Sequence, residues 1–350
     1  MKLSNAFTEH LQIKYPIIQA PMLGVSTPEM AAAISNEGGL GSLAVGGLSP
    51  DATRTLIGKT KSLTNKPFAV NLFVHELPSY NDSDLEPMRQ FLIQLANKKG
   101  YQLNASDLSN FTLYTYRDQV EILIDEKVNI ISFTFGCLDQ SAIKKFKENN
   151  CILIGTVTCL QEALILQEQQ IDMITAQGIE AGGHRGTFLD NIPLPHVGLF
   201  SLLSQLNQKI KLPYIAAGGI NSGRGIKAAL DLGAVAVQIG TAFIGTNESE
   251  AILSYKQKLE RAVDTDSALT RAFSGRWARG LRNQLMNDIE NANIPIPPYP
   301  LQNSLTGKFR KLAQQNNDAD YTNLWAGQSS GSQKSKLTKE VFLELIQHIG

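Results

Sequence analysis

The segment Tyr214-Ile215-Ala216-Ala217-Gly218-Gly219-Ile220-Asn221-Ser222-Gly223 contains, in order, a short apolar run, a glycine turn and the beginning of a helical pattern. The apolar run does not alternate between polar and apolar residues, which is typical of a strand buried on both faces. Consecutive glycines allow a tight turn after such a strand. The segment therefore predicts a β-strand followed directly by an α-helix, the repeating unit of parallel sheets.

The same unit recurs along the chain. Strands are expected at Pro16–Gln19, Leu40–Leu43, Phe68–Leu72, Ile130–Phe133, Ile152–Gly155, Met173–Ala176, Tyr214–Ala217 and Val235–Ile239. Helical patterns lie between most of them, at Pro28–Asn36, Pro50–Leu63, Asp139–Asn149, Leu160–Gln169, Gly198–Asn207 and Ser222–Leu232. Eight such units favour an α/β fold of the closed (β/α)8, or TIM, barrel type. An open α/β sheet with one miscounted strand is the alternative.

Two segments interrupt this rhythm. The first, His75–Tyr116, is polar, and the second runs from about Thr246 to the end with helices expected near Ser249–Ala262 and Lys339–Ile349. We interpret both as parts of one smaller, mostly helical cap over the barrel mouth. The predicted division is a barrel of residues 1–74 and 117–245 and a cap of residues 75–116 and 246–350.

The charge balance excludes several classes of partner. The 350 residues include 32 Lys plus Arg and 32 Asp plus Glu, a formal net charge of zero. Without a basic field, neither nucleic acid nor an anionic membrane surface is an expected partner. The short basic cluster Lys308–Lys311 is interpreted as a solvated helix face. The composition does not indicate an oligomeric state.

The cysteines and the beginning of the chain indicate the compartment. Cys137, Cys151 and Cys159 form no CxxC pair, and they fit neither a disulfide framework nor a zinc site, so no metal is expected. Met1–Tyr15 lacks the apolar run of a signal peptide, and no apolar stretch is long enough to span a bilayer. A soluble, cytoplasmic protein is expected.

Barrel enzymes bind ligands at the C-terminal ends of their strands, so the residues after each strand are informative. Ala20-Pro21-Met22 follow the first strand, and these small or rigid residues would let the backbone approach a flat ligand. Asn71 lies at the end of the third strand, where its amide can hydrogen-bond a ligand. An ordinary βα turn and a turn-forming asparagine are the alternative interpretations.

The segment Gln177-Gly178-Ile179-Glu180-Ala181-Gly182-Gly183-His184-Arg185-Gly186 follows the sixth strand. Its glycines, Gly182 and Gly183 among them, form a loop whose N–H groups can face an electron-rich ring or a phosphate. Gln177, at the strand tip, can both donate and accept hydrogen bonds. His184 has glycine neighbours that do not shield it, which makes it a candidate general base or proton donor. A solvent-exposed loop histidine is the alternative.

Glycine turns after the seventh and eighth strands predict an anion site. Gly218 and Gly219 precede a helix, and the turn Gln238-Ile239-Gly240-Thr241 follows the next strand. Turns in these two units form the phosphate site of many barrels. A phosphate there and polar strand ends elsewhere describe an elongated ligand, for which FMN fits. A phosphorylated substrate of a lyase or isomerase is the alternative ligand, but no strand-end lysine or carboxylate pair supports it.

Several motifs resemble one enzyme family, the nitronate monooxygenases, formerly called 2-nitropropane dioxygenases. They are Gln19–Met22, Gly24–Pro28, Ser35–Leu43, Ala176–Gly186, Ala216–Ile220 and Val237–Phe243. Two further motifs, Phe273-Ser274-Gly275-Arg276-Trp277-Ala278-Arg279-Gly280 and Tyr299-Pro300-Leu301-Gln302, are similar to those of the class that accepts propionate 3-nitronate. The resemblance covers nearly the whole chain.

The resemblance implies non-covalent FMN, no metal, and oxidation of alkyl nitronates by O2 to a carbonyl compound and nitrite. Matched residue by residue, Asn71, Gln177, Gly182, Gly219 and Gln238–Thr241 would contact FMN. His184 would be the catalytic histidine and would contact the substrate, and Tyr299 would line the substrate pocket. Family members carry Tyr and Lys residues that bind a substrate carboxylate. Asn303 and Lys308 occupy that neighbourhood here without a secure alignment.

Two other functions are compatible with the same motifs. A flavin-dependent enoyl-acyl-carrier-protein reductase that uses NADH is similar in the Gly-Gly-His region, but Gln177 and the long C-terminal segment favour the monooxygenase. A flavin-storing or regulatory protein without turnover is the alternative from a different class. A Rossmann dinucleotide site is disfavoured because Gly38-Gly39-Leu40-Gly41 does not stand between a strand and its helix.

Overall fold

The computed structural model describes residues 4–347 and 349, apart from residues 110, 191 and 332–334. Eight parallel strands form its centre: β1 (Ile17–Gln19), β2 (Gly41–Ala44), β3 (Phe68–Phe73), β4 (Ile130–Thr134), β5 (Ile152–Val157), β6 (Met173–Gln177), β8 (Tyr214–Ala217) and β9 (Ala236–Ile239). They pair in the order β1-β9-β8-β6-β5-β4-β3-β2, and a bridge between Ile18 and Leu40 joins the two ends. The predicted (β/α)8 barrel is therefore confirmed.

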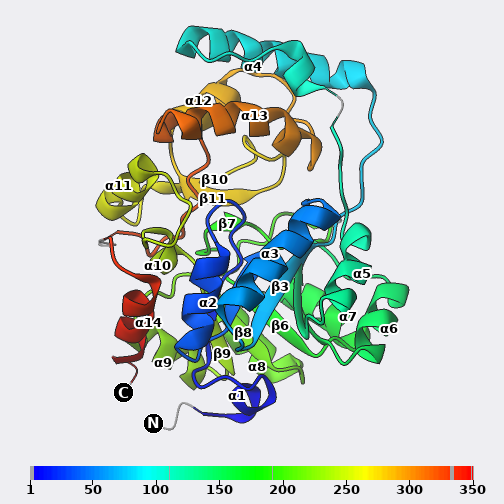
Figure 1. Ribbon diagram of the computed structural model, residues 1–350, viewed down its shortest axis with the longest axis vertical. Coiled ribbons are helices and arrows are strands. Elements are labelled where there is room, and N and C mark those ends of the chain that lie inside the picture. The colour runs from blue at the N-terminus through cyan, green and yellow to red at the C-terminus, as the bar shows by residue number, and fades with distance from the viewer. Residues whose placement is uncertain (1–3, 110, 191, 332–334, 348, 350) are drawn as a thin grey trace.

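Helices surround this barrel, as the unbroken apolar strands require (Figure 1). They are α2 (Pro28–Asn36), α3 (Pro50–Leu63), α5 (Arg117–Asp125), α6 (Gln140–Glu148), α7 (Leu160–Glu168), α8 (Leu199–Lys209), α9 (Gly223–Asp231) and the short α10 (Thr241–Ile244), with α1 (Ala6–His10) near the N-terminus. In β2 and β8 every residue is buried, because the barrel interior covers one face and helices cover the other. Among the described residues, every helix is too short or too polar to cross a bilayer.

The last helix, α14 (Thr338–Gln347), lies on the barrel, although the sequence placed it in the cap. It contacts α2, α9 and α10, and the side chains of Phe342 and Leu345 are buried in the barrel's hydrophobic core (Figure 1, red). The apolar face of a helix can be buried against any apolar surface that the helix reaches. The helical pattern of this segment therefore could not show that it packs on the barrel and not on the cap.

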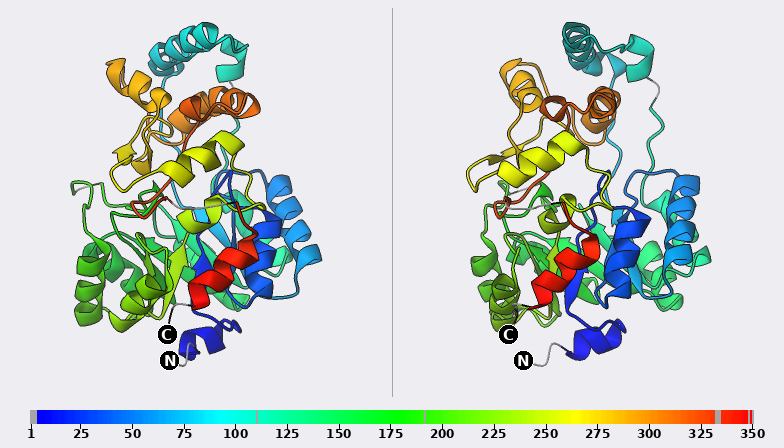
Figure 2. Two further views of the ribbon diagram at one scale, coloured as in Figure 1. Left: turned by 90° about the vertical axis from the view of Figure 1, so that its left-hand side faces the viewer. Right: turned by 60° about the vertical axis from the view of Figure 1, so that its left-hand side comes forward.

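A second hydrophobic core lies in a cap above the barrel mouth (Figures 1 and 2). The helical elements of the cap are η1 (Asp82–Leu85), α4 (Glu86–Lys99), η2 (Ala105–Leu108), α11 (Leu253–Arg261), α12 (Gln284–Asn291), α13 (Leu301–Gln315) and η3 (Ala319–Tyr321). A small antiparallel sheet of β10 (Ser267–Thr270), β11 (Ala278–Leu281) and β7 (Gly183–His184) completes it. The first insertion and the C-terminal segment share one core, in which Met88 of α4 packs with Phe309 of α13.

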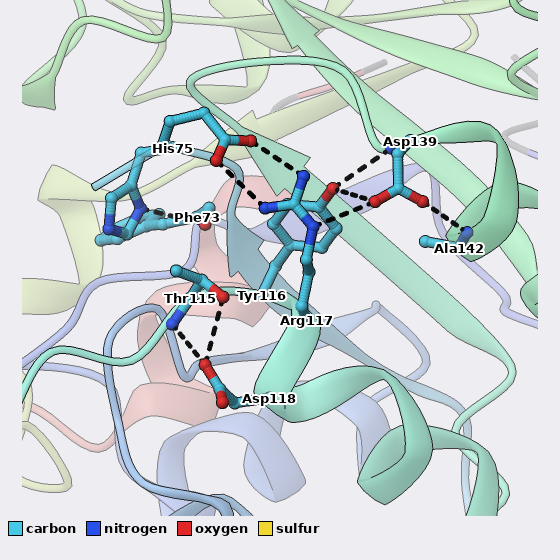
Figure 3. Close-up of polar contacts among 9 residues, drawn as sticks. Phe73, His75, Thr115, Tyr116, Arg117, Asp118, Asp139 and Ala142 are labelled. Carbon is cyan, nitrogen blue, oxygen red and sulfur yellow. Dashed lines mark hydrogen bonds and ion pairs between the residues drawn. The ribbon is translucent and has the colours of Figure 1, made fainter. Parts of the chain in front are cut away.

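The chain leaves the barrel for the cap near Glu76 and returns near Arg117, and ion pairs at the barrel surface link these two segments (Figure 3). Arg117 forms ion pairs with Glu76 on the segment that leaves the barrel (2.9 Å) and with Asp139 on the barrel (3.1 Å). The Tyr116 hydroxyl also donates to Asp139 (2.8 Å), which in addition caps α6 by accepting from the Ala142 N–H (2.8 Å). Asp139 therefore connects the base of the cap insertion to the start of a barrel helix.

We expect Asp139→Ala to lower the free energy of unfolding by about 1–2 kcal/mol, since loss of a helix N-cap alone has this effect. Denaturant titration measures the change, with Gln140→Ala, an exposed neighbour on the same helix, as the control. The Ala142 N–H and then the Tyr116 hydroxyl lower the pKa of Asp139. Its contribution is therefore present above about pH 4 and is lost as the pH falls through the lowered pKa. An unchanged stability at neutral pH would contradict this role.

Candidate active site

One cavity of about 340 Å³ opens at the C-terminal ends of the barrel strands, where the cap covers them. All the residues that the sequence predicted for the site line it: Ala20, Pro21, Met22, Asn71, Gln177, Gly182, Gly183, His184, Gly218, Gly219, Gln238, Ile239, Gly240, Thr241 and Tyr299. Tyr299 comes from the cap, and the others come from barrel strands and the turns after them. The barrel topology therefore brings together residues that are far apart in the chain.

His184 is held by strand pairing. The loop after β6 rises into the cap, where Gly183 and His184 form β7 and pair antiparallel with Arg279 and Ala278 of β11. Gly183 has a positive φ of 74°, a conformation that is unfavourable for other residues. The histidine consequently has a defined direction into the cavity.

Aromatic rings enclose the His184 imidazole. The ring centroids lie 5.2 Å from Trp325, 5.5 Å from Phe135, 6.1 Å from Tyr299 and 6.2 Å from Phe73. Burial, and then the positive charges of Arg276 and Arg310, lower the pKa of His184 to about 3. The prediction that His184 is unshielded is therefore wrong, because residues distant in the sequence surround it. The imidazole is neutral at physiological pH.

Ser274 occupies one nitrogen of this imidazole. His184 Nε2 lies 2.8 Å from Ser274 Oγ, which also contacts the backbone oxygen of Arg276 at 3.2 Å. Because Nε2 is engaged in this hydrogen bond, Nδ1 is the ring nitrogen left for a ligand in the cavity. A neutral imidazole can donate or accept a proton at Nδ1, depending on which tautomer Ser274 stabilises.

Gln177 stabilises the loop that carries His184. Its amide oxygen accepts from Arg185 Nη1 (3.0 Å) and from the Gly186 N–H (2.9 Å), and its Nε2 donates to the His184 carbonyl (2.9 Å). The oxygen is thereby fully used within the protein, and one N–H of the amide remains for a ligand. The side chain thus has a positioning role that its place at the strand tip did not indicate.

Glu162 of α7 anchors the other end of the same loop and was not identified from the sequence. One carboxylate oxygen accepts from the Thr158 N–H (2.5 Å) and hydroxyl (2.8 Å). The other accepts from the Thr187 hydroxyl (2.6 Å) and the Phe188 N–H (2.8 Å). Glu162 is completely buried, and its negative charge partly offsets the burial that lowers the pKa of the buried Arg185 guanidinium. A glutamate in the first turn of a helix gives no sequence signal of this environment.

The glycine turns lie beside a segment of the cap. Gly218 and Gly219 have φ values of 115° and 69°. The Ser329 hydroxyl donates to the Gly219 carbonyl (2.7 Å), and the Gly327 N–H donates to Thr241 Oγ1 (3.0 Å). A Cβ on Gly182 would lie 2.5 Å from the Gly327 nitrogen, so this glycine is required for the close approach of the cap segment.

Asn71 offers an unpaired acceptor. Its amide nitrogen donates to Ser132 Oγ at 2.9 Å, which orients the side chain. Its Oδ1 is buried and has no hydrogen-bond partner in the described structure, and the residue lines the cavity. Since buried polar atoms are normally paired, this oxygen indicates a ligand with an N–H or O–H donor.

The cap contributes cavity residues that the sequence did not predict. They include Arg310 and Trp325. Of the two residues named from the family resemblance, Asn303 also lines the cavity, whereas Lys308 is exposed and pairs with Asp107 at 3.4 Å. The interpretation of Lys308–Lys311 as a solvated face is therefore wrong for Arg310. The signal was present, since residues 303, 306 and 310 share one helix face by their spacing. No group of three or more His, Cys, Asp or Glu side chains in the described residues could hold a metal ion.

A (β/α)8 barrel with a cofactor-sized cavity at its strand ends, glycine turns on two adjacent strands and a half-buried histidine defines a class of oxidoreductases. The family model described as nitronate monooxygenase matches residues 4–348 of the chain. The chain therefore belongs to the nitronate monooxygenase family, whose members are flavin-dependent oxidoreductases.

Relatives and solved structures agree with this assignment. A probable nitronate monooxygenase of Staphylococcus saprophyticus is 40% identical over 331 residues, which cover 94% of this chain and 93% of the relative. The structure of nitroalkane oxidase from Streptomyces ansochromogenes aligns with a TM-score of 0.89 at 34% identity, covering 99% and 98% of the two chains. FabK from Thermotoga maritima aligns with a TM-score of 0.77 at 28% identity, covering 99% and 96%. The predicted family is thus confirmed.

Proposed function

We propose that the chain is an FMN-dependent monooxygenase that oxidises an anionic alkyl nitronate, propionate 3-nitronate being the first candidate, with O2. The observation that carries this proposal is the composition of the cavity at the barrel mouth. Glycine turns suited to a phosphate line its barrel side, and the neutral His184 lies on its cap side within the field of Arg276 and Arg310. A flavin phosphate and a nitronate anion are complementary to these two ends.

The residues present fit FMN. The unpaired Asn71 Oδ1 is suited to accept from an N–H of the isoalloxazine, and the turns at Gly218–Gly219 and Gly240–Thr241 are suited to hold the phosphate. Ala20, Pro21 and Met22 line the same cavity and leave room for a flat ring. Bound FMN would supply the electron-accepting group and the site of reaction with O2.

The chain's own residues bind and orient the nitronate. His184 lines the cavity, and its Nδ1 is the ring nitrogen left to hydrogen-bond a nitro oxygen. The half-buried cations Arg276 and Arg310 favour an anion over a neutral nitroalkane. Tyr299, Trp325 and Phe73 surround the imidazole and limit access of water. Because a nitronate is already deprotonated at carbon, His184 has to position the substrate more than to abstract a proton.

The proposed activity is tested with the purified protein. We expect a flavin absorbance spectrum, a change in that spectrum on anaerobic addition of propionate 3-nitronate, and oxygen uptake with nitrite release in air. Oxidation of NADH by an enoyl thioester, without nitronate turnover, would favour the enoyl-acyl-carrier-protein reductase. A yellow protein that reacts with neither pair would favour flavin storage, and a protein that FMN cannot reconstitute would contradict all three.

We expect Asn71→Ala to raise the dissociation constant for FMN by about fivefold to thirtyfold, which corresponds to about 1–2 kcal/mol for one buried hydrogen bond. Ser132→Ala is the matched comparison, because it removes the group that orients the amide but keeps the Asn71 oxygen, and its effect should be smaller. Titration of the apoprotein with FMN, followed by flavin fluorescence, measures both. Equal affinities of Asn71→Ala and the unsubstituted protein would contradict the assigned contact.

A further inference from the structure

Arg185 is a buried cation that the proposed chemistry does not use. Its side chain is completely buried, and it contacts Gln177, which lines the cavity. Nη1 donates to the Gln177 amide oxygen (3.0 Å) and to the Gly178 carbonyl (2.6 Å), and Nη2 donates to the Gln177 carbonyl (3.2 Å). These contacts hold the guanidinium against the C-terminal end of β6.

The charge of Arg185 has no ion-pair partner among the described residues. Its acceptors are three neutral oxygens, and its Nε has no acceptor. Burial lowers the pKa of Arg185 to about 10, so the group is a cation at neutral pH. Burying a cation without an ion pair is unfavourable, and an apolar side chain of similar size would fill the same space without that cost. Packing alone therefore does not explain an arginine at this position.

The Gln177 amide connects this cation to the cavity. Its oxygen accepts from Arg185 and from the Gly186 N–H (2.9 Å), and its nitrogen donates to the His184 carbonyl (2.9 Å) and has one N–H left. A cation that donates to the oxygen of an amide withdraws electron density from its nitrogen, and hydrogen bonds in such a chain strengthen one another. The remaining N–H of Gln177 is therefore a stronger donor than that of an ordinary glutamine.

A ligand whose negative charge increases during the reaction would benefit from such a donor. FMN gains negative charge when it accepts electrons, and a positive charge or a hydrogen-bond donor beside its ring favours the reduced form. Two hydrogen bonds and one amide group span roughly 8 Å, a separation at which a unit charge still changes a binding constant by about tenfold in partly buried surroundings. Arg185 can therefore act on FMN without touching it.

We propose that Arg185 is a positioning residue that orients and strengthens the free N–H of Gln177 toward bound FMN, and that it thereby makes FMN easier to reduce. This inference rests on the proposed function, because FMN has to occupy the cavity. It goes beyond that function, since it assigns control of the reduction potential to a side chain outside the cavity. The electrons come from the nitronate and pass to O2, as in the proposed reaction, so no further reactant is required.

The test measures the midpoint potential of FMN in the loaded protein by anaerobic reduction against reference dyes. We expect Arg185→Met to weaken the binding of reduced FMN by about tenfold more than the binding of oxidised FMN. For a two-electron couple, this factor lowers the midpoint potential by about 30 mV. A purely structural role would weaken the binding of both forms alike and would leave the potential unchanged. An unchanged potential in FMN-loaded Arg185→Met would overturn the proposal.

Arg279→Met is the matched control. This arginine of β11 is also buried and donates to a carbonyl of the same loop, that of Ile179 (3.0 Å), but in the described structure it forms no hydrogen bond with Gln177. Its loss should change the ratio of the two FMN affinities by less than about threefold, because no amide connects its charge to the cavity. Equal shifts in the two methionine variants would overturn the role assigned to the contact with Gln177.

A lysine pair covers the case in which Arg185→Met does not fold. A lysine keeps the charge but cannot reproduce the planar, two-pronged contact of Arg185, so the potential should fall further in Arg185→Lys than in Arg279→Lys. Equal potentials in these two variants would overturn the proposal. If the unsubstituted protein binds FMN but oxidises no nitronate, the proposed activity fails, and the potentials still decide on Arg185. A protein that binds no FMN would overturn both.

Discussion

His184→Ala should lower kcat/KM for the nitronate by about a thousandfold while FMN remains bound, an effect within the usual range for removal of a positioned acid–base or hydrogen-bonding group. Oxygen uptake measures the loss, and the flavin absorbance of the purified variant measures the cofactor content. His196→Ala is the control, because that histidine is exposed in the loop before α8. Full turnover by His184→Ala with FMN bound would contradict the catalytic role.

The size of this effect follows from the preorganisation of the imidazole. Strand pairing through β7, the hydrogen bond to Ser274 and the ring of Trp325 together determine where Nδ1 lies. An alanine would leave a space that water can enter, and water would hydrogen-bond the nitronate without a defined direction. Ser274→Ala should have a smaller effect, since it removes one of these constraints and keeps the imidazole.

The same residue has a pH signature. Because the pKa of His184 is lowered to about 3 by burial and by Arg276 and Arg310, the unfolded chain binds a proton there below about pH 6.5 and the folded protein does not. His184 therefore does not reduce the free energy of unfolding above pH 6.5, and it reduces it progressively as the pH decreases from 6.5 toward the pKa of the folded protein. In denaturant titrations between pH 7 and pH 4, the free energy of unfolding should fall more steeply for the unsubstituted protein than for His184→Ala. Parallel pH profiles of the free energy of unfolding would contradict a neutral His184 enclosed by aromatic rings.

The second large effect is expected for Glu162→Gln, which should lower the free energy of unfolding by about 3–5 kcal/mol. Hydrogen bonds to a buried carboxylate are strong, and donors that lose this acceptor remain buried without a partner. The carboxylate has two donors at each oxygen, and an amide NH2 would place N–H groups against one pair of them. Thermal and denaturant unfolding of the FMN-loaded protein measure the loss. Glu168→Gln, exposed on the same helix, provides the control.

This substitution should also reduce FMN binding, since Thr187 and Phe188 immediately follow the loop that carries His184. Without Glu162, the end of that loop loses its attachment to α7. A variant with native stability would show that the four hydrogen bonds of the carboxylate contribute little. A variant that is destabilised but retains the native FMN affinity would show that the loop is positioned from β11 alone.

The residues that line the cavity on the side where FMN is proposed to bind could be predicted one by one. Asn71 lies near the end of a strand, and Gly218–Gly219 and Gly240–Thr241 directly follow strands. In a parallel barrel the C-terminal ends of all the strands meet at the same mouth. Once the strands were identified from their apolar runs, proximity of these residues followed from topology alone. The roles of Gln177 and Gly182 could not be predicted, because their partners, Arg185 and Gly327, are determined by loop geometry.

The residues on the proposed substrate side of the cavity could be predicted less completely. Tyr299 entered through the family resemblance, whereas Arg310 was assigned to a solvated basic cluster and Ser274 had no assigned role. A sequence of basic residues on a helix does not indicate which of them faces a cavity when another chain segment covers that side. Asn323 and Trp325 belong to that segment, and their contacts with Arg310 and His184 connect residues far apart in the chain.

By itself, then, the sequence determined the eight strands, the barrel and the set of glycine and amide residues at its mouth. It could do so because strand patterns, turn glycines and helix starts are local features with fixed periods. The tertiary structure alone decided that His184 is neutral, that α14 packs on the barrel, and that Arg310 is an unpaired cation beside the cavity. The burial of a side chain and the charges around it depend on which distant segments pack over it. No local pattern along the chain specifies which segments those are.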